Sequence, residues 1–351
     1  MSFENVNFSA NPSFKFKEIV VEKTECLGGT YQYDCFKGDD GETYLISPYW
    51  DIDNIEKREH HISIINLRTR ETRVLNGHKD RVLTVRYFQD PYTKKHYLIS
   101  ADRKTRVLVW DLSDNYKIIL DTELKYESFI YSVLLFFEEN KIYAVTSTLS
   151  NGETFVIPLD DKEHKIEIPN TKDFNIYFLT YWWDEKNKEH NIIQCGKNKI
   201  KISQFKARTD FEFQTDDKHP YNMDGMVFKN KGKDYLITTA TYGLIKVIDL
   251  EERREIVSMT FDDVFFCSFV RWNDYYILLN DKLQRRILVL DMENNYQVIS
   301  KVLLPEMYHD KFIKKIDHPK YGESLLSVGI DWKLKLFVNR TITSDDIPAS
   351  Q

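Results

Sequence analysis

The chain contains 351 residues, of which 42% are hydrophobic and 30% charged, a composition typical of a globular protein that buries a core. Its net charge of −6 argues against direct nucleic-acid binding, because neutralising phosphates requires a basic surface. There is no apolar run of about 18 residues, and the N-terminus lacks a basic segment followed by an apolar one, so neither a membrane-spanning helix nor a secretory signal is expected.

The cysteines are spread widely along the chain. Cys26, Cys35, Cys195 and Cys267 form no CxxC pair. This spacing predicts reduced thiols rather than a disulfide framework. Reduced thiols are typical of a cytoplasmic protein, with the nucleus and the cytoskeleton as alternative locations.

No pattern in the chain predicts catalysis or a cofactor. Neither GxxxxGK[ST] nor GxGxxG occurs, so nucleotide binding has no supporting motif. No serine or cysteine stands in a recognisable nucleophile motif. His60 and His61 are adjacent, but their side chains diverge and the nearest cysteine is distant in sequence, which argues against a zinc site. We therefore expect a protein that is not an enzyme and that holds neither cofactor nor metal.

Short runs rich in β-branched and aromatic residues follow one another along the chain, separated by polar turns. Residues 1–14 and 341–351 are polar and are expected to be flexible tails. Residues 15–21 form the first expected strand, six groups of four strands follow, and a seventh group ends after three. The first strands of the seven groups are expected at residues 30–36, 82–88, 130–137, 176–183, 223–228, 266–271 and 313–317.

A long polar loop interrupts the first group, between its second and third strands. Residues 48–59 include Tyr49, Trp50 and several acidic side chains. Loops of this length are often functional or disordered. The acidic residues lack the spacing and the glycine of a calcium loop, so we expect a solvated acidic loop rather than a cation site.

The second group carries a recognisable motif. Gly77-His78 opens it and Trp110-Asp111 closes it, about 30 residues apart, with three β-patterned runs between them. This stretch resembles a WD40 repeat, and weaker copies recur with a period of roughly 42 to 49 residues. The resemblance implies an all-β fold: a seven-bladed β-propeller of four-stranded antiparallel blades over residues 15–340. In this arrangement the N-terminal strand completes the last blade.

WD40 repeats can contain a buried hydrogen-bond chain formed by a histidine, a serine or threonine, an aspartate and a tryptophan. The resemblance assigns this chain to His78, Ser100, Asp102 and Trp110 in blade two, to His309, Ser327 and Asp331 in blade seven, and to His219 and Thr238 in blade five. Asp102 lies two residues closer to Ser100 than is usual in the family. Loss of one member would leave a buried polar group unpaired, at roughly 1–3 kcal/mol, so these histidines are expected to be structural.

The same resemblance places a partner-binding surface on the narrow top face of the propeller. Several of the implied positions carry aromatic or arginine side chains, which are common at binding hot spots. The positions are Tyr31, Arg81, Leu83, Arg103, Phe129, Tyr131, Tyr177, Asn222, Asp224, Thr241, Phe265, Phe312, Lys314 and Ile330. The alternative is that half or more of them, Phe129 and Phe265 above all, pack against the next blade.

The resemblance implies a non-catalytic scaffold that binds a peptide or domain on its top face, as a monomeric subunit of a hetero-complex, away from membranes. A structural subunit of a cytoskeletal, ciliary or ribonucleoprotein assembly is the alternative. A substrate receptor of a ubiquitin ligase is less favoured, because neither residues 110–113 nor residues 65–68 complete the Trp-Asp-x-Arg motif of that class. A histone or RNA reader would have to rely on Arg81, Arg103 and Lys314.

Overall fold

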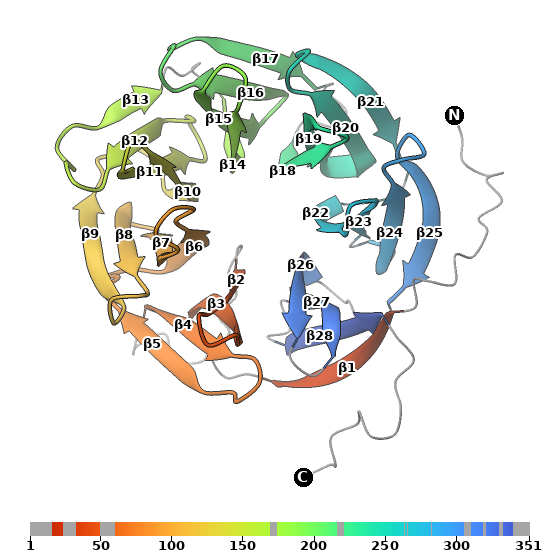
Figure 1. Ribbon diagram of the computed structural model, residues 1–351, viewed down its shortest axis with the longest axis horizontal. Coiled ribbons are helices and arrows are strands. Elements are labelled where there is room, and N and C mark those ends of the chain that lie inside the picture. Colours follow the sequence, from red (N-terminus) through yellow and green to blue (C-terminus); the bar gives the residue numbers. More distant parts are fainter. Residues whose placement is uncertain are drawn as a thin grey trace.

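The computed structural model of the chain describes residues 16–23, 33–49, 60–168, 174–215, 221–262, 264, 266–281, 283–304, 310–318, 321–329 and 333–339. Its strands form seven four-stranded antiparallel sheets, the blades, arranged in a ring around a central axis (Figure 1). In this described part of the chain, no helix is long and apolar enough to cross a membrane. The expected all-β, seven-bladed propeller is confirmed.

Blades one to six each follow the chain outward, from an inner strand beside the axis to an outer strand at the rim (Figure 1). Blade one contains β2 (Asp34–Lys37), β3 (Thr43–Tyr49), β4 (His61–Asn66) and β5 (Thr72–Asn76), and blade two contains β6 (Val82–Gln89), β7 (His96–Asp102), β8 (Arg106–Asp111) and β9 (Lys117–Glu123). Blade three contains β10 (Ile130–Glu138), β11 (Lys141–Thr148), β12 (Thr154–Pro158) and β13 (Ile166–Ile168).

Blade four contains β14 (Ile176–Asp184), β15 (Glu189–Gly196), β16 (Lys199–Gln204) and β17 (Asp210–Gln214). Blade five contains β18 (Asn222–Asn230), β19 (Lys233–Ala240), the 3₁₀ turn η1 (Thr241–Gly243), β20 (Leu244–Asp249) and β21 (Arg254–Thr260). Blade six contains β22 (Phe266–Trp272), β23 (Tyr276–Asp281), β24 (Arg286–Asp291) and β25 (Gln297–Leu303).

Blade seven combines strands from opposite ends of the chain. It contains β26 (Asp310–His318), β27 (Gly322–Gly329), β28 (Lys333–Asn339) and β1 (Phe16–Lys23), which is antiparallel to β28. The register places Glu18 opposite Phe337 and shifts between Val20 and Lys23. The first and last strands of the chain therefore share one sheet.

The hairpin of β3 and β4 is longer than expected. Pro48 and Tyr49, which were assigned to the loop, belong to β3, where Tyr49 pairs with His61. The two rings stack with their centroids 4.2 Å apart, and this cross-strand contact stabilises the end of the hairpin. The remainder of the expected loop, residues 50–59, lies outside the described residues.

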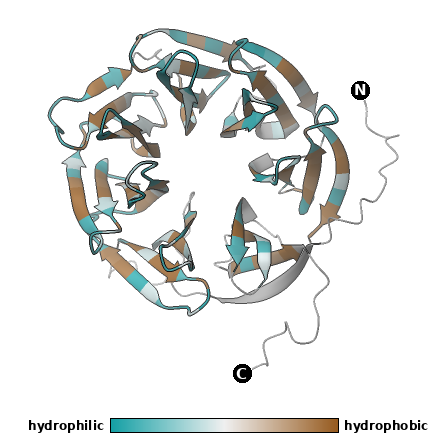
Figure 2. Ribbon diagram, viewed as in Figure 1, coloured by the Kyte–Doolittle hydropathy of each residue, from teal (hydrophilic) through white to brown (hydrophobic). Residues whose placement is uncertain are grey.

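Burial differs between the middle and outer strands of each blade. Every residue of β4, β7 and β15 is buried. The outer strands β5 and β9 each bury only one residue, Leu75 and Leu120 respectively. Neighbouring blades cover both faces of a middle strand, whereas an outer strand keeps solvent beside it. Figure 2 accordingly shows hydrophobic residues along the strands and hydrophilic residues in the loops between them.

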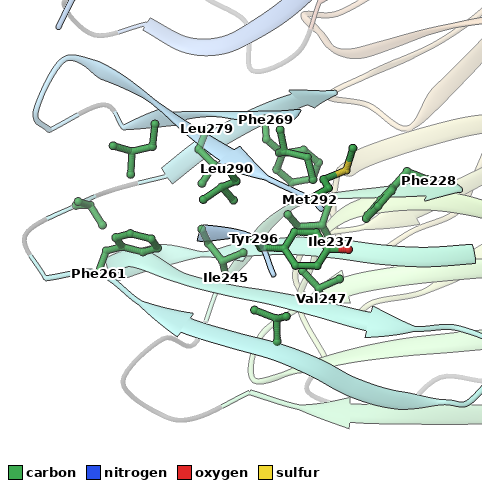
Figure 3. Packing of buried hydrophobic residues seen from close by; sticks show 14 residues of the cluster. Phe228, Ile237, Ile245, Val247, Phe261, Phe269, Leu279, Leu290, Met292 and Tyr296 are labelled. Carbon is green, nitrogen blue, oxygen red and sulfur yellow. The ribbon is translucent and has the colours of Figure 1, made fainter. Parts of the chain in front are cut away.

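The core consists of hydrophobic clusters, several of which lie between adjacent blades. Figure 3 shows one of them, in which Phe228 and Ile237 of blade five meet Phe269, Leu279 and Leu290 of blade six. All five side chains are buried. Burial of such side chains contributes roughly 1.5–3 kcal/mol each, so blade-to-blade packing is a major source of stability.

Adjacent tryptophans in β14 illustrate the alternation of side chains along a strand. Trp182 is 4% exposed and packs with Leu236 and Leu250 of blade five. Its indole N–H donates to Asp234 Oδ2 at 3.2 Å. Trp183 is 37% exposed. One tryptophan therefore belongs to the core between blades, and its neighbour lies nearer the surface.

The boundary between blades one and two contains an arrangement that we call the first clasp: Phe36, Asp39, Tyr87 and His96. Phe36 stacks on Tyr87 with ring centroids 4.9 Å apart. The Tyr87 hydroxyl lies 2.6 Å from His96 Nδ1, and His96 Nε2 lies 3.0 Å from Asp39 Oδ1. A neutral imidazole protonated on Nε2 satisfies both contacts, since it accepts from Tyr87 and donates to Asp39.

The boundary between blades three and four repeats this arrangement as the second clasp: Phe136, Glu138, Tyr181 and His190. Phe136 stacks on Tyr181 at 5.6 Å. The Tyr181 hydroxyl lies 2.7 Å from His190 Nδ1, and His190 Nε2 lies 3.6 Å from Glu138 Oε1. Both clasps therefore tie the inner strand of one blade to the first two strands of the next.

Candidate interaction surface on the top face

The inner strands of blades two to seven share an irregularity near their first residues. In each of them the register with the second strand shifts after the first pair. Such a bulge leaves one extra residue unpaired and redirects its side chain. In β10 and β14 the extra residues are Tyr131 and Tyr177, so the bulges carry both rings at the start of their inner strands, on the top face.

Four aromatic side chains form a continuous line over blades three, four and five, which we call the aromatic row. Ring centroids are 6.4 Å apart between Phe129 and Tyr131, 6.3 Å between Tyr131 and Tyr177, and 5.3 Å between Tyr177 and Tyr221. All four residues are partly exposed. Burial raises the pKa of Tyr177, so its phenol stays neutral at physiological pH and can donate a hydrogen bond.

An open groove continues the aromatic row toward blade two. Its volume is about 650 Å³, and Phe129 lines it as well as beginning the row. Arg103 and Lys104 line the groove together with Glu123 and Glu127. The top face therefore offers aromatic and charged contacts over four consecutive blades.

The expected partner-binding positions are thus brought together only in part. Phe129, Tyr131 and Tyr177 meet in the aromatic row, and Arg103 is exposed at the groove. Arg81 is partly buried, and its carbonyl accepts the backbone N–H of Arg103 at 2.9 Å. Tyr221, which completes the row, was missed by sequence reasoning, because the blade-five inner strand was expected to begin at Met223, whereas β18 begins one residue earlier, at Asn222.

Two of the expected positions are buried. Leu83 is 7% exposed and Asn222 is 1% exposed. The Asn222 amide donates to the carbonyls of Gly196 at 2.6 Å and Lys199 at 3.3 Å, so it joins blades four and five. These two expectations are corrected, because neither side chain is presented to a partner. The positions Tyr31, Phe265 and Ile330, and the side chains of Thr241 and Phe312, lie outside the described residues.

The hydrogen-bond chain of blade two is present. His78 Nε2 lies 2.8 Å from Ser100 Oγ, Trp110 Nε1 donates to the same oxygen at 3.2 Å, and His78 Nδ1 lies 3.1 Å from Asp102 Oδ2. All four residues are buried. Asp102 Oδ1 also accepts the backbone N–H of Arg106 at 3.1 Å. One carboxylate therefore holds both the histidine and the turn that carries the groove residues.

Blade three replaces this chain with a shorter one that sequence reasoning missed. The Tyr126 hydroxyl lies 2.7 Å from Thr146 Oγ1, and Thr146 is fully buried. Burial raises the pKa of Tyr126 and keeps its phenol protonated. Tyr126 stands four residues before Ile130, as His78 stands four residues before Val82. This equivalent position was the signal in the sequence from which the contact of Tyr126 could have been inferred.

The other assigned chains are only partly described. Thr238 of blade five is 1% exposed and Ser327 of blade seven is fully buried. His219, His309 and Asp331 lie outside the described residues. The hydrogen-bond chains of these two blades therefore stay predictions.

Asp224 and Lys314 are the last two expected positions, and both line the central channel. The channel holds a cavity of about 400 Å³, which Arg86 and Phe178 also line. These residues belong to β18, β26, β6 and β14, four inner strands that surround the axis (Figure 1). Both residues therefore lie at the axis, and the expectation that they bind a partner stays a prediction.

Opposite charges from four blades meet in this channel. Lys314 Nζ lies 3.1 Å from Asp34 Oδ1, and the Tyr87 backbone N–H donates to Asp34 Oδ2 at 2.9 Å. Burial acts to raise the pKa of Asp34, but Lys314 and Arg86 outweigh it, so the pKa is lowered. Burial raises the pKa of Asp224 to about 6, although Arg86 and Lys314 oppose the shift. Of Asp34 and Asp224, Asp34 is therefore the more firmly ionised carboxylate.

Within the described residues, no three His, Cys, Asp or Glu side chains are grouped so that they could hold a metal ion. Cys35 and Cys195 are free thiols, whereas Cys26 and the side chain of Cys267 lie outside the described residues.

Comparisons with known proteins establish the fold alone. No family model matches the sequence, and no curated protein matches it. Among solved structures, the β-propeller domain of Cps50 (Swd1) from Myceliophteria thermophila is similar, with a TM-score of 0.68. The similarity covers 93% of this chain and 100% of that domain, at 12% sequence identity. The chain therefore has the seven-bladed β-propeller fold that WD40 repeats form.

Proposed function

We propose that the protein is a non-catalytic interaction scaffold that binds a peptide segment or a domain across the aromatic row, within a larger protein complex. The observation that carries this proposal is the continuity of Phe129, Tyr131, Tyr177 and Tyr221 over three blades. Partly exposed aromatic rings supply large contact areas at a small entropic cost, which is why they are enriched at binding hot spots.

The spacing of the rings favours an extended segment as the bound element. Successive centroids are 5.3–6.4 Å apart. An extended chain advances about 6.6 Å for every two residues, so alternate side chains of such a segment would meet successive rings. The groove beside Phe129 would then hold one end of the segment, between Arg103 and Glu127.

Other observations support a scaffold in a reducing compartment, which we propose to be the cytoplasm. The phenol of Tyr177 stays neutral, because burial raises its pKa, so it is suited to contact and hydrogen bonding rather than to nucleophilic chemistry. Cys35 and Cys195 are free thiols, as expected where disulfides do not persist.

Affinity capture from native extract tests the proposal. The variants Tyr131→Glu and Tyr177→Glu place a charge in the row, whereas Tyr275→Glu alters a tyrosine that is 51% exposed in the turn at the opposite end of an inner strand. We expect row variants with unchanged melting temperature to lose at least one partner by roughly tenfold, and Tyr275→Glu to retain it. Retention of every partner by both folded row variants would overturn the proposal.

A further inference from the structure

The central channel contains a cationic side chain that the fold holds in place without using its hydrogen-bond donors. The Arg86 guanidinium lies over the Phe178 ring, 4.5 Å from its centroid. Among the described residues this guanidinium forms no hydrogen bond and no contact ion pair, although its charge acts to lower the pKa values of Asp34 and Asp224. Stacking fixes the plane of the group, so its five N–H donors are directed along that plane.

A second cation reaches the same cavity with donors to spare. Lys314 pairs with Asp34 at 3.1 Å, which uses one of its three N–H groups. Asp34 also accepts the backbone N–H groups of Cys35 at 3.0 Å and Tyr87 at 2.9 Å. Asp34 therefore positions Lys314 and has little capacity left to satisfy Arg86.

The other charged groups of the cavity are paired, except for Asp224. Arg271 is paired with Asp274 at 2.9 Å, and Lys315 is paired with Glu323. Asp224 accepts the backbone N–H of Gly225 at 2.9 Å. Burial raises the pKa of Asp224 to about 6, so its carboxylate opposes a bound anion at neutral pH and loses its charge in more acidic solution. The free hydrogen-bond donors of the channel belong to Arg86 and Lys314.

We propose that the central channel is a binding site for a small oxyanion, a phosphate or carboxylate compound held between Arg86 and Lys314. A planar guanidinium that stacks on a ring can bind two oxygens of such a group in parallel. Lys314 supplies a second, compact charge. The cavity of about 400 Å³ falls within the size range of small-molecule sites. This site is separate from the aromatic row and does not depend on the proposed function.

Calorimetric titration of the full chain with inorganic phosphate, pyrophosphate and citrate tests the site. We expect at least one of the three to bind, and Arg86→Gln to weaken that binding by about tenfold or more. Asp224→Asn removes the opposing carboxyl, so we expect it to tighten binding by roughly threefold to tenfold at neutral pH. The matched control is Lys229→Gln, which alters a lysine that is paired with Glu185 and lies away from the cavity.

Each outcome of this experiment decides for or against the site. Preference for phosphate or pyrophosphate identifies a phosphate compound, and preference for citrate identifies a carboxylate. Absence of binding by all three, or equal losses in Arg86→Gln and Lys229→Gln, would overturn the proposal. If Arg86→Gln lowers the melting temperature so far that it is unfolded, Lys314→Met provides the same test, and unchanged affinity in that folded variant also overturns the site.

Discussion

The two clasps place phenylalanine, tyrosine and histidine side chains at two blade boundaries. They differ in the environment of their acidic side chain. In the first clasp, Asp39 is mostly exposed, with 82% of its side chain accessible, and it bonds His96 at 3.0 Å. In the second, the Glu138 side chain is 5% exposed and lies 3.6 Å from His190. Lys206 pairs with Glu138 at 2.7 Å.

This difference teaches that a repeated aromatic framework does not fix the electrostatics of a boundary. Burial lowers the pKa of His190, although Glu138 opposes the shift. Trp183 also lies close to the imidazole, with ring centroids 4.5 Å apart, and helps to keep water away from it. The first clasp is therefore expected to rely on solvated contacts, and the second on burial.

The largest expected effect comes from the aromatic centre of the second clasp. Phe136→Ala should lower the free energy of unfolding by roughly 3–5 kcal/mol. The ring is 1% exposed and packs on Tyr181, Tyr143 and Phe205, so its removal leaves a cavity. Phe36→Ala should cost less, since Phe36 is 8% exposed. Denaturant unfolding measures the loss of stability in both variants. An equal or larger loss for Phe36→Ala would contradict the expected difference between the clasps.

The tyrosine hydroxyls should show a smaller effect that is similar in both clasps. Tyr87→Phe and Tyr181→Phe each remove a donor to a histidine Nδ1, at 2.6 and 2.7 Å respectively. Leaving that nitrogen unpaired should cost about 1–3 kcal/mol in each variant. Thermal unfolding compares the two, and a measurable loss in only one variant would show that the clasps are not equivalent at this position.

The pH dependence of stability should reveal the burial of His190 in the second clasp. The pKa of His190 is lowered in the folded chain, so below pH 6.5 the unfolded state takes up the proton more readily. The contribution of His190 is therefore complete above pH 6.5 and declines as the pH falls below it. His190→Gln should flatten the stability profile between pH 6.5 and 5, and an unchanged slope in this variant would contradict the assignment.

The smallest effect is expected for the solvated acid. Asp39→Asn should change the free energy of unfolding by less than about 0.5 kcal/mol, because the Asp39 side chain is 82% exposed and an exposed charge contributes little. Glu138→Gln should cost more, since it removes the buried partner of Lys206 and His190. Salt titration provides the control. The difference in unfolding midpoint between the wild-type chain and Asp39→Asn should become smaller at high ionic strength.

Much of the fold could be predicted from sequence because its evidence is local. Alternating hydrophobic residues, polar turns and a period close to that of a propeller blade indicated seven sheets. Strand alternation alone also accounts for the different burial of Trp182 and Trp183. The extent of β3 was not, because the stacking of Tyr49 on His61 is a contact between strands that no local pattern records.

The candidate site could be predicted only in part. Phe129, Tyr131 and Tyr177 were placed on the top face from the WD40 resemblance, and they lie together in the aromatic row. Leu83 and Asn222 were placed there by the same reasoning, but both are buried. Position within a repeat indicates which end of a strand a residue occupies, but not whether its neighbours cover it.

The sequence by itself determined the strands, their grouping into blades and the family they resemble, because each depends on spacing along the chain. Only the tertiary structure decided which side chains meet between blades. Asp34, Arg86, Asp224 and Lys314 converge from four blades that are far apart in sequence. A register shift of one residue turns a side chain to the other face of a sheet, as the bulge at Tyr131 shows. Contacts between blades join residues of different repeats and are therefore invisible within any one repeat.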